Sequence, residues 1–399
     1  MTNNSPTPRG LAPLYLAGFT TAFGAHGVAS VLGSENDEIG MSLLGLGLVL
    51  ALYDLAEVVL KPLFGALSDR IGAKPVIIGG LVAFAAASAV AFVMPTVLAL
   101  ALARLGQGAA ASAFSPASSA SVARLAGKQR LGRYFGRYGA WKSLGYVLGP
   151  LLGILLTQWA GIAAVYAVLG ALAIVAAAWI ALAMPALPVL PRTRTTLVDL
   201  AREVTARGFL VPTLMLATST AVIGVAVGFL PLLATRLGLP PILGAVAVAV
   251  LALVSTAVQP LVGRWRDDGK ISTRVGSTAG LVLAAAALVL LAIAPGAVTI
   301  LVAASAFGLM TGTVTPLAFA HLADVTPDAR MGRTMGSAEL GREIGDAGGP
   351  LLVGAVATAW TLPAALTMLG GVSALSGLIG WLAQSPRERS EDRHSDAAS

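Results

Sequence analysis

Two stretches, FSPASSASVARLAGKQRLGRYFGRYGAWKSLGYVLGP (residues 114–150) and VTPLAFAHLADVTPDARMGRTMGSAELGREIGDAGGP (residues 314–350), align without a gap. The offset is constant, since 316 minus 116 is 200. The identical residues include prolines, glycines and arginines, among them Pro116 and Pro316, Arg133 and Arg333, and Pro150 and Pro350. Earlier in each half, KPLFGALSD (61–69) pairs with QPLVGRWRD (259–267). Because self-similarity at a fixed separation marks a duplicated unit, the sequence predicts two halves of one design.

The composition is too apolar for one soluble core. Of the 399 residues, 56% are hydrophobic and 11% are charged, and the mean hydropathy is +0.83. Stretches of about 20 apolar residues, the length that crosses a bilayer as a helix, recur along the whole chain. The alternation of barrel strands is missing, so these spans are expected to be helices. We predict an all-α membrane protein with twelve transmembrane helices, at 11–32, 41–64, 75–94, 97–122, 133–157, 162–184, 209–234, 241–262, 275–294, 297–321, 333–357 and 362–383.

The spans divide into two pseudo-symmetric six-helix bundles. Residues 1–184 form the first bundle, 209–384 the second, and 385–399 a disordered tail. The linker 185–208 opens with prolines and then places Leu197, Leu200, Ala201 and Val204 on one face of a surface-lying amphipathic helix. In transporters built from parallel repeats, the substrate site lies near the midplane between the halves.

The positive charge orients the chain. Of its 26 basic residues, 21 fall in segments that one orientation places on a single side, whereas the first opposite loop, SENDEIG at 34–40, is acidic. The positive-inside rule therefore places both termini in the cytoplasm of a multi-pass protein of the cell (inner) membrane. This distribution argues against a nucleic-acid partner. The first apolar segment lacks a small-residue cleavage site, so we interpret it as a retained helix.

Enzyme and metal chemistry have no support in the sequence. There is no cysteine, the three histidines are scattered, and neither HExxH nor GxxxxGK[ST] occurs. We therefore expect no metal, no cofactor and no enzymatic activity. The alternative of a membrane-embedded enzyme or a receptor would need a catalytic constellation or an added soluble domain.

Two predicted helices carry charges on one face. Asp54, Glu57 and Lys61 follow i, i+3, i+7 spacing in the second span. The eleventh span carries Glu339, Arg342, Glu343 and Asp346. Counted over all predicted spans, the membrane holds five acids and four bases. The acids are Asp54, Glu57, Glu339, Glu343 and Asp346, and the bases are Lys61, Arg104, Lys142 and Arg342.

One carboxyl is left over in this count. A carboxyl desolvated without a partner holds a proton more tightly, so it can bind and release a proton as its surroundings change. Asp54 is the first candidate, and Asp346 or Glu343 is the second. In the alternative interpretation, Glu57 with Lys61, and Arg342 with Asp346 or Glu339, are locked ion pairs that only fix the packing.

Three motifs give the chain a resemblance to a known family. They are GALSDRIGAK at 65–74, LxxxRxxQG at 100–108, and Gly136-x8-Gly145-x3-Gly149-Pro150-x2-Gly153. With twelve spans and a duplicated half, they resemble the major facilitator superfamily over essentially the whole chain. The third resembles its antiporter motif, with Ile154 in place of the final glycine, and the first has Ala73 where a second basic residue is common.

The resemblance implies a role for each motif. The first would be a gating loop, formed by Gly65, Asp69, Arg70, Gly72 and Lys74, with Asp69 facing the start of helix eleven near 332–336. The plainer reading makes Arg70 and Lys74 positive-inside charges. The second motif associates Arg104 with proton handling; the alternative is that Arg104 snorkels to the membrane interface. Helices two and eleven, and five and eight, would abut across the halves.

Together these features favour a monomeric, proton-coupled antiporter that exports small lipophilic or cationic solutes by alternating access. Its proton-coupling residues would be Asp54, Glu57, Arg104, Glu343 and Asp346. Its substrate cavity would include Tyr53, Trp141, Lys142, Tyr146 and Arg342, with further aromatic walls from Phe19, Phe23 and Phe229. The alternative is a proton-driven symporter or a uniporter for a polar metabolite or organic anion, with Lys142, Arg342 and Arg104 as the anion clamp.

Overall fold

The computed structural model describes residues 10–34, 43–94, 96–189, 205–240 and 242–383, and these residues form α-helices and short 3₁₀ turns. The all-α prediction is therefore confirmed for the described part of the chain. Its eleven α-helices are α1 (Leu11–Ser34), α2 (Leu43–Ile71), α3 (Ala73–Val93), α4 (Val97–Ala126), α5 (Leu131–Ala183), α7 (Arg207–Arg236), α8 (Ile242–Asp267), α9 (Thr273–Ile293), α10 (Ala297–Val325), α11 (Met331–Ala359) and α12 (Leu362–Ala383).

Helix α5 carries two of the predicted spans, 133–157 and 162–184. No loop separates them, and the helix is interrupted only at Ala160 and Gly161. Gly161 has a φ of 73°, in the left-handed region that favours glycine. The number of helices among the described residues is therefore lower than the predicted number of spans, because a single glycine break takes the place of a connecting loop.

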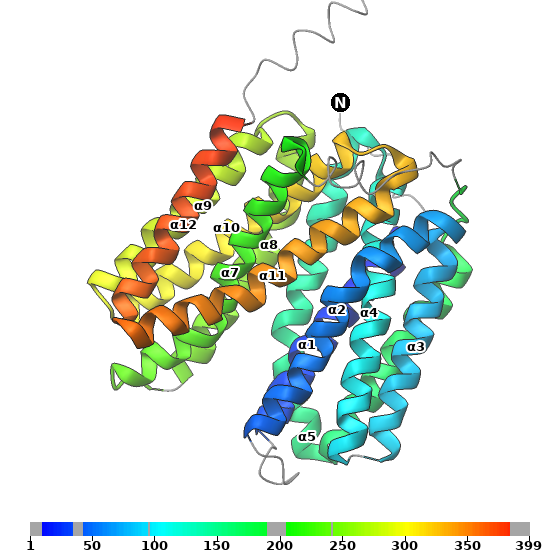
Figure 1. The fold of residues 1–399 in the computed structure, drawn as a ribbon, viewed down its shortest axis with the longest axis horizontal. Helices are drawn as coiled ribbons and strands as arrows, with labels where there is room; N and C mark the ends of the chain where they lie inside the picture. Colours follow the sequence, from blue (N-terminus) through cyan, green and yellow to red (C-terminus); the bar gives the residue numbers. More distant parts are fainter. Residues whose placement is uncertain (1–9, 35–42, 95, 190–204, 241, 384–399) are drawn as a thin grey trace, which may run out of the picture.

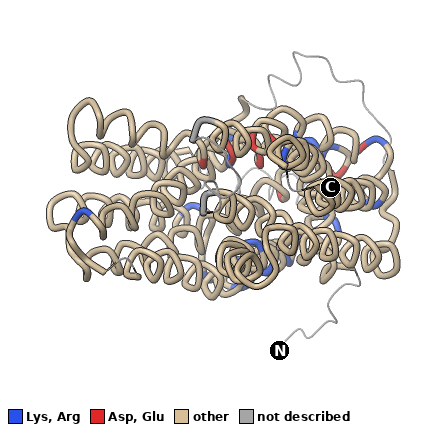
Figure 2. Tube along the Cα trace, turned by 90° about the horizontal axis from the view of Figure 1, so that it is seen from below, with Lys and Arg blue, Asp and Glu red and all other residues tan. Residues whose placement is uncertain are grey.

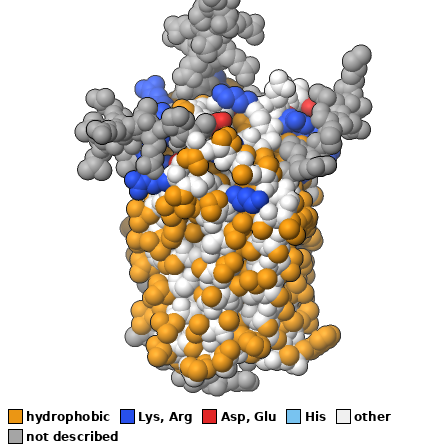
Figure 3. Space-filling view, turned by 90° about the vertical axis from the view of Figure 1, so that its right-hand side faces the viewer, with side chains coloured by type: hydrophobic (Ala, Val, Ile, Leu, Met, Phe, Trp, Pro, Cys, Tyr) orange, Lys and Arg blue, Asp and Glu red, His pale blue; other side chains and the backbone are white. Residues whose placement is uncertain are grey.

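Eight helices are long and apolar enough to cross a membrane: α3, α4, α5, α7, α8, α9, α10 and α12. Helices α2 and α11, which carry the charged stripes, do not meet that criterion, and neither does α1. Figure 3 shows a flank covered with hydrophobic side chains and Lys and Arg gathered toward one end. This distribution is typical of a membrane-embedded surface. The predicted amphipathic linker helix falls mostly on 190–204 and the predicted tail on 384–399, outside the described residues.

The buried apolar residues form two main clusters. The first is built largely from α1 to α5 and the second from α7 to α12. Figure 1 shows these two groups of helices side by side, with α11 crossing the second group diagonally and meeting α2 toward its N-terminal end. Across the boundary between the two groups α2 packs on α11 and α5 packs on α8. These two contacts, the α2–α11 seam and the α5–α8 seam, position the candidate site.

Glycines allow the helices to approach closely at both seams. A Cβ on Gly65 would lie 2.5 Å from the Gly332 carbonyl oxygen, and one on Gly263 would overlap with the Gly132 carbonyl oxygen. A Cβ on Gly136 would likewise overlap with the Gln259 carbonyl oxygen. The backbones therefore touch where larger residues would hold them apart.

Candidate functional site between the two halves

Each seam ends in a carboxylate that binds the first turn of the facing helix. The two carboxylate oxygens of Asp69, near the end of α2, accept hydrogen bonds from the backbone N–H groups of Gly332 (2.8 Å) and Arg333 (2.9 Å). The first-turn N–H groups of a helix have no intrahelical partner and favour a negative charge. Asp69 therefore joins α2 to the start of α11, where the gating-loop interpretation expected it to lie.

The α5–α8 seam has the same arrangement. Asp267, at the end of α8, accepts hydrogen bonds from the N–H groups of Gly132 (2.8 Å) and Arg133 (2.7 Å) at the start of α5. We call the two contacts the latches, and the end of the molecule where they lie the latch end. The second latch was not predicted, although the pairing of 61–69 with 259–267 already aligned Asp267 with Asp69.

The other predicted gating residues lie beside the latch without reaching α11. Gly72 follows α2 with a φ of 96°, and Arg70 is exposed. Lys74 donates hydrogen bonds to the carbonyl oxygens of Ala181 (2.8 Å) and Met184 (2.7 Å). Because these carbonyls lie at the end of α5, Lys74 stabilises that helix terminus. Of the predicted set, Gly65 and Asp69 are the residues that meet α11.

A buried charge cluster lies farther along the α2–α11 seam. The Lys61 ammonium is 3.0 Å from the Glu57 carboxylate and 2.7 Å from that of Glu343, and it lies 3.9 Å from Glu339. Only 1% of the Lys61 side chain is exposed. Figure 2 shows acidic residues gathered in one stretch near the middle of the molecule. The ionic interaction crosses from one half to the other and is shielded from solvent.

Glu339 connects this cluster to two further helices. Its carboxylate accepts hydrogen bonds from the hydroxyls of Ser115 and Ser119 on α4, both at 2.5 Å. The Lys142 ammonium on α5 lies 4.0 Å away. Glu339 is fully buried and joins α2, α4, α5 and α11. It was absent from the predicted proton-coupling set, because no sequence signal fixes which serines of α4 face α11.

Two intramembrane carboxylates remain without a partner among the described residues. Neither Asp54 nor Asp346 has an ion pair or a hydrogen bond there, and both are at least partly exposed. The charges acting on Asp54 are chiefly those of Arg104 and Glu343, and Asp346 interacts electrostatically with Asp54 itself. The charge count predicted one leftover carboxyl; the structure has two.

Both carboxylates lie on the same side of the charge cluster. Along α2 the order is Asp54, Glu57, Lys61 and then Asp69 at the latch, and α11 runs from its latch residue toward Asp346. At 1.5 Å per residue, Asp54 lies about 22 Å from the Asp69 latch along the helix. The unpaired carboxylates are therefore near the midplane, on the side away from the latch end.

The buried arginines are held by neutral groups, which explains the second unpaired carboxylate. Arg104 is 2% exposed, donates a hydrogen bond to the Gly24 carbonyl oxygen (3.0 Å) and lies 4.1 Å from the ring centroid of Tyr53. The prediction that it faces the interior is confirmed, and the snorkelling alternative is wrong. Its charge is stabilised by a carbonyl dipole and an aromatic face.

Arg342 donates a hydrogen bond to the Tyr146 hydroxyl at 3.3 Å. No ion pair joins it to Asp346 or Glu339 within the described ranges, so that half of the locked-pair interpretation is wrong. The other half, Glu57 with Lys61, is present. Lys61 also binds Glu343 on the opposite helix, so this pair does more than fix the packing within α2.

The predicted antiporter motif forms the contact between α5 and α1. Ideal Cβ atoms on Gly145, Gly149 and Gly153 would lie 2.7 to 3.2 Å from atoms of α1 such as the Phe19 carbonyl oxygen and the Gly27 backbone. Pro150 lies within the same stretch of α5. Gly136 instead faces α8 across the seam. The motif therefore brings α1 and α5 together beside the charge cluster.

The predicted cavity residues surround the cluster in part. The Tyr53 hydroxyl is 3.5 Å from Glu57, Lys142 lies beside Glu339, and Tyr146 binds Arg342. Tyr146 also packs against His26, with ring centroids 4.4 Å apart. Trp141 is 43% exposed and lies edge-to-face with Phe19 at 6.4 Å. Aromatic and charged groups from α1, α2, α5 and α11 therefore share one region.

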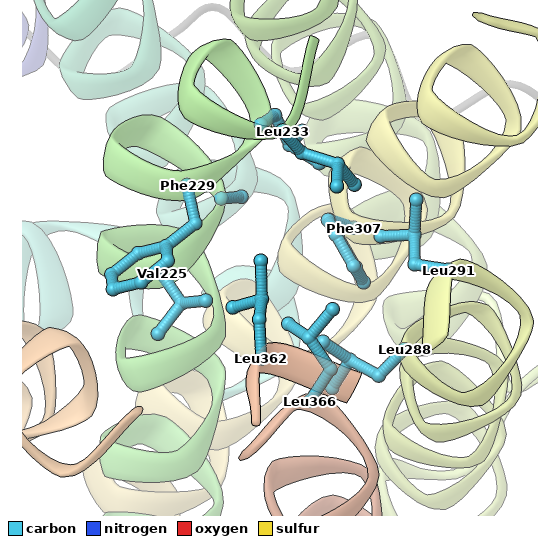
Figure 4. A pocket seen from close by; sticks show the side chains of 10 residues that line it. Val225, Phe229, Leu233, Leu288, Leu291, Phe307, Leu362 and Leu366 are labelled. Atoms are coloured by element: carbon cyan, nitrogen blue, oxygen red, sulfur yellow. The ribbon is translucent and has the colours of Figure 1, made fainter. Parts of the chain in front are cut away.

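A separate apolar pocket lies within the second cluster of helices (Figure 4). Its lining residues come from α7, α9, α10 and α12: Val225, Ala226, Phe229, Leu230, Leu233, Leu288, Leu291, Phe307, Leu362 and Leu366. Of the predicted aromatic walls, Phe229 lines it. The pocket contains no charged side chain and lies apart from the charge cluster.

Replacing Asp69 with asparagine is expected to loosen the latch. Charge-assisted hydrogen bonds are roughly twice as strong as neutral ones, so the fraction of molecules with the latch open should rise about tenfold. The chain has no cysteine, so spin labels at Ile71→Cys and Asp328→Cys, both exposed positions on opposite sides of the seam, report its opening. Asp267→Asn is the matched variant of the α5–α8 seam, and spin labels at Asp268→Cys and Lys128→Cys report the opening of that seam. Unchanged distance distributions would show that the latches do not hold the seams closed.

Comparison with known proteins gives the family context. A model of the Major Facilitator Superfamily matches residues 14–303 and 214–398. Inner membrane transport protein YajR of Escherichia coli is 32% identical over 139 residues, which cover 34% of this chain and 30% of that protein. Multidrug resistance protein MdtH of Yersinia pestis is 33% identical over 159 residues, or 38% and 37% of the two chains. Each match spans less than half of the curated relative.

The solved structures extend the likeness to the whole fold. The crystal structure of the human organic anion transporter MFSD10 (TETRAN) matches with a TM-score of 0.79, over 94% of this chain and 100% of that chain, at 19% identity. The apolar helices and the family match make the protein a multi-pass membrane protein of a transporter family. Because the family model matches most of the chain, the protein belongs to the Major Facilitator Superfamily.

Proposed function

We propose that the protein is a proton-coupled antiporter of the inner membrane that exports small lipophilic or cationic organic solutes by alternating access. The latch end and both termini lie in the cytoplasm in this account. The bundles are residues 1–184 and 209–384, with twelve spans when the two segments of α5 are counted separately. A monomer suffices, since one chain supplies both halves of the site.

The unpaired carboxylates carry this proposal. Asp54 and Asp346 lie near the midplane on opposite halves, without a basic partner among the described residues. Ionisable groups within a membrane are unfavourable unless they pair or face water, so they mark proton and ion pathways. Two such groups beside a cluster that joins the halves can couple proton binding to the contact between them.

The chemistry follows from the closed latches. While the latch end is closed, protons reach Asp54 and Asp346 from the opposite side of the membrane. Neutralising them changes the field at Glu343 and Lys61, and a proton that moves on to Glu343 removes its attraction to Lys61. The weakened seam opens toward the cytoplasm, where protons leave and substrate enters. Substrate binding then favours return to the latch-closed state.

The substrate class is supported by the surroundings of the site. Tyr146, which binds Arg342, packs against His26, and Phe19 packs against Trp141, so α1 and α5 carry aromatic groups of the kind that lines sites for lipophilic ligands. Two unpaired carboxylates favour cationic solutes over anions. MdtH, which matches part of the chain, is a multidrug resistance protein, and this agrees with the proposal.

The anion-clamp alternative has less support. Of its three cations, Arg104 is occupied by the Gly24 carbonyl oxygen and the Tyr53 ring, and Lys142 lies beside Glu339. Arg342 alone would remain for an anion, and it already binds Tyr146.

Inverted membrane vesicles acidified inside provide the test. If the protein exchanges protons for solute, adding the lipophilic cation ethidium outside should dissipate the proton gradient and drive ethidium into the vesicles. Vesicles without the protein are the control. Solute movement that requires protons on the same face would instead establish the symporter, and movement indifferent to the gradient would establish a uniporter.

A further inference from the structure

The two seams share one hydrogen-bond pattern, but only one of them is charged. In the α2–α11 seam, Lys61 donates to Glu57 four residues earlier (3.0 Å) and to Glu343 across the seam (2.7 Å). In the α5–α8 seam, the Gln259 amide donates to the hydroxyl of Ser255 four residues earlier (2.9 Å) and to that of Ser143 across the seam (2.8 Å).

The duplication places these groups at equivalent positions. Gln259 takes the position of Lys61 and Ser255 that of Glu57, since both pairs are 198 residues apart (259 minus 61, 255 minus 57). Ser143 takes the position of Glu343, 200 residues apart (343 minus 143). Each of these three ionisable groups of the α2–α11 seam is thus replaced by a neutral one in the α5–α8 seam. We call the α2–α11 seam the charged seam and the α5–α8 seam the neutral seam.

The charged seam is surrounded by titratable groups from five helices. These are Tyr53 and Asp54 on α2, Glu339, Arg342 and Asp346 on α11, Arg104 on α4, Tyr138, Lys142 and Tyr146 on α5, and His26 on α1. At the neutral seam Gln259 is 1% exposed, and its amide hydrogen bonds go to two serines. Serine hydroxyls and a glutamine amide do not ionise in the working pH range.

The seams are otherwise similar. Each ends in an aspartate latch, and each brings glycine backbones into contact beside that latch. At the latch of the neutral seam Arg266 also pairs with Asp267 (3.4 Å), where the charged seam has Ser68. At the three equivalent midplane positions, the charges lie in the charged seam alone. Protonation can change the attraction between α2 and α11, whereas no comparable change is available between α5 and α8.

We propose that closure of the charged seam is set by protonation and that the Gln259, Ser255 and Ser143 group holds the neutral seam independently of pH. The neutral seam then keeps the halves in register while the charged seam opens and closes. This inference rests on the alternating access of the proposed function. It assigns positioning roles to three residues that no motif marks.

The test compares the two label pairs. In parent protein, the Ile71–Asp328 pair should report an open fraction that rises about tenfold from alkaline to acidic buffer. A tenfold change lies within the range usual for coupled equilibria. The open fraction reported by the Asp268–Lys128 pair should not change with pH. The variant Glu57→Ser/Lys61→Gln/Glu343→Ser gives the charged seam the residues of the neutral one. Its Ile71–Asp328 distances should no longer depend on pH.

Two further variants complete the design. Gln259→Ala should open the Asp268–Lys128 pair to the same extent at every pH. If the triple variant does not fold, Glu343→Gln alone should abolish most of the pH response. The inference would be overturned if the Ile71–Asp328 distances still depended on pH in both the triple variant and Glu343→Gln. It would also be overturned if the parent protein showed an equal pH response at both label pairs.

Vesicle exchange separates this inference from the proposed function. Parent protein that exchanges protons for ethidium, but whose charged seam is insensitive to pH, would overturn the inference alone. A pH-sensitive charged seam in parent protein that exchanges no protons would support the inference and overturn the proposed antiport.

Discussion

Replacing Lys61 with alanine is expected to destabilise the protein more than any other single change in the charged seam. Lys61 is the shared partner of Glu57 and Glu343, and Glu339 lies 3.9 Å away. Removing one partner of a buried ion pair costs about 3–5 kcal/mol, because the remaining charge stays buried without compensation. The thermal unfolding midpoint of the purified protein in detergent should therefore fall markedly.

The equivalent position of the other seam supplies the control. Gln259→Ala removes two neutral hydrogen bonds and leaves Ser143 and Ser255 bonded to each other, so its expected cost is about 1–3 kcal/mol, that of two net hydrogen bonds. The variant Glu57→Ala/Lys61→Ala/Glu343→Ala, which removes the opposing charges as well, should recover part of the lost stability. Equal midpoints for Lys61→Ala and Gln259→Ala would show that the charges do not dominate the energetics of the seam.

Replacing Gly65 with valine should prevent closure of the latch end. A Cβ at this position would lie 2.5 Å from the Gly332 carbonyl oxygen and 3.4 Å from the Cα atom of Gly336. Both neighbours are backbone, so the helices must separate, at a cost of about 1–3 kcal/mol or more. The Asp69 latch cannot form across the wider gap, and transport should fall to background.

Gly47→Val on the same helix is the matched control, since nothing lies within 4 Å of an ideal Cβ there. Spin-label distances between Ile71→Cys and Asp328→Cys should lengthen in the Gly65 variant and stay unchanged in the Gly47 variant. Normal transport by Gly65→Val would contradict the view that close backbone contact at this seam is needed for the cycle.

The sequence predicted much of the arrangement that forms the site. The family resemblance led to Asp69 meeting the start of α11, and helical spacing led to the charged stripes on α2 and α11. These features depend on motif and position along the chain. The pairing of 61–69 with 259–267 also aligned Asp267 with Asp69, so the second latch followed from information already in the sequence.

Features that depend on helix rotation and on competing partners could not be predicted. Glu339 binds Ser115 and Ser119. Helix α4 carries serines on several of its faces, and only the packing of α4 against α11 determines which of them reach Glu339. The Arg104 guanidinium interacts with a backbone carbonyl and the Tyr53 ring. Counting charged residues cannot predict such neutral partners. The break at Gly161 likewise joined two predicted spans without a loop, because one left-handed glycine suffices to redirect the helix.

The central claim is that Asp54 and Asp346 bind the transported protons. It is tested most directly by measuring proton release when ethidium is added to purified protein in weakly buffered detergent solution. Parent protein should release protons as ethidium binds, and Asp54→Asn/Asp346→Asn should release almost none, whereas Asp268→Asn, on the surface, should behave like the parent. Undiminished proton release by the double variant would contradict the account.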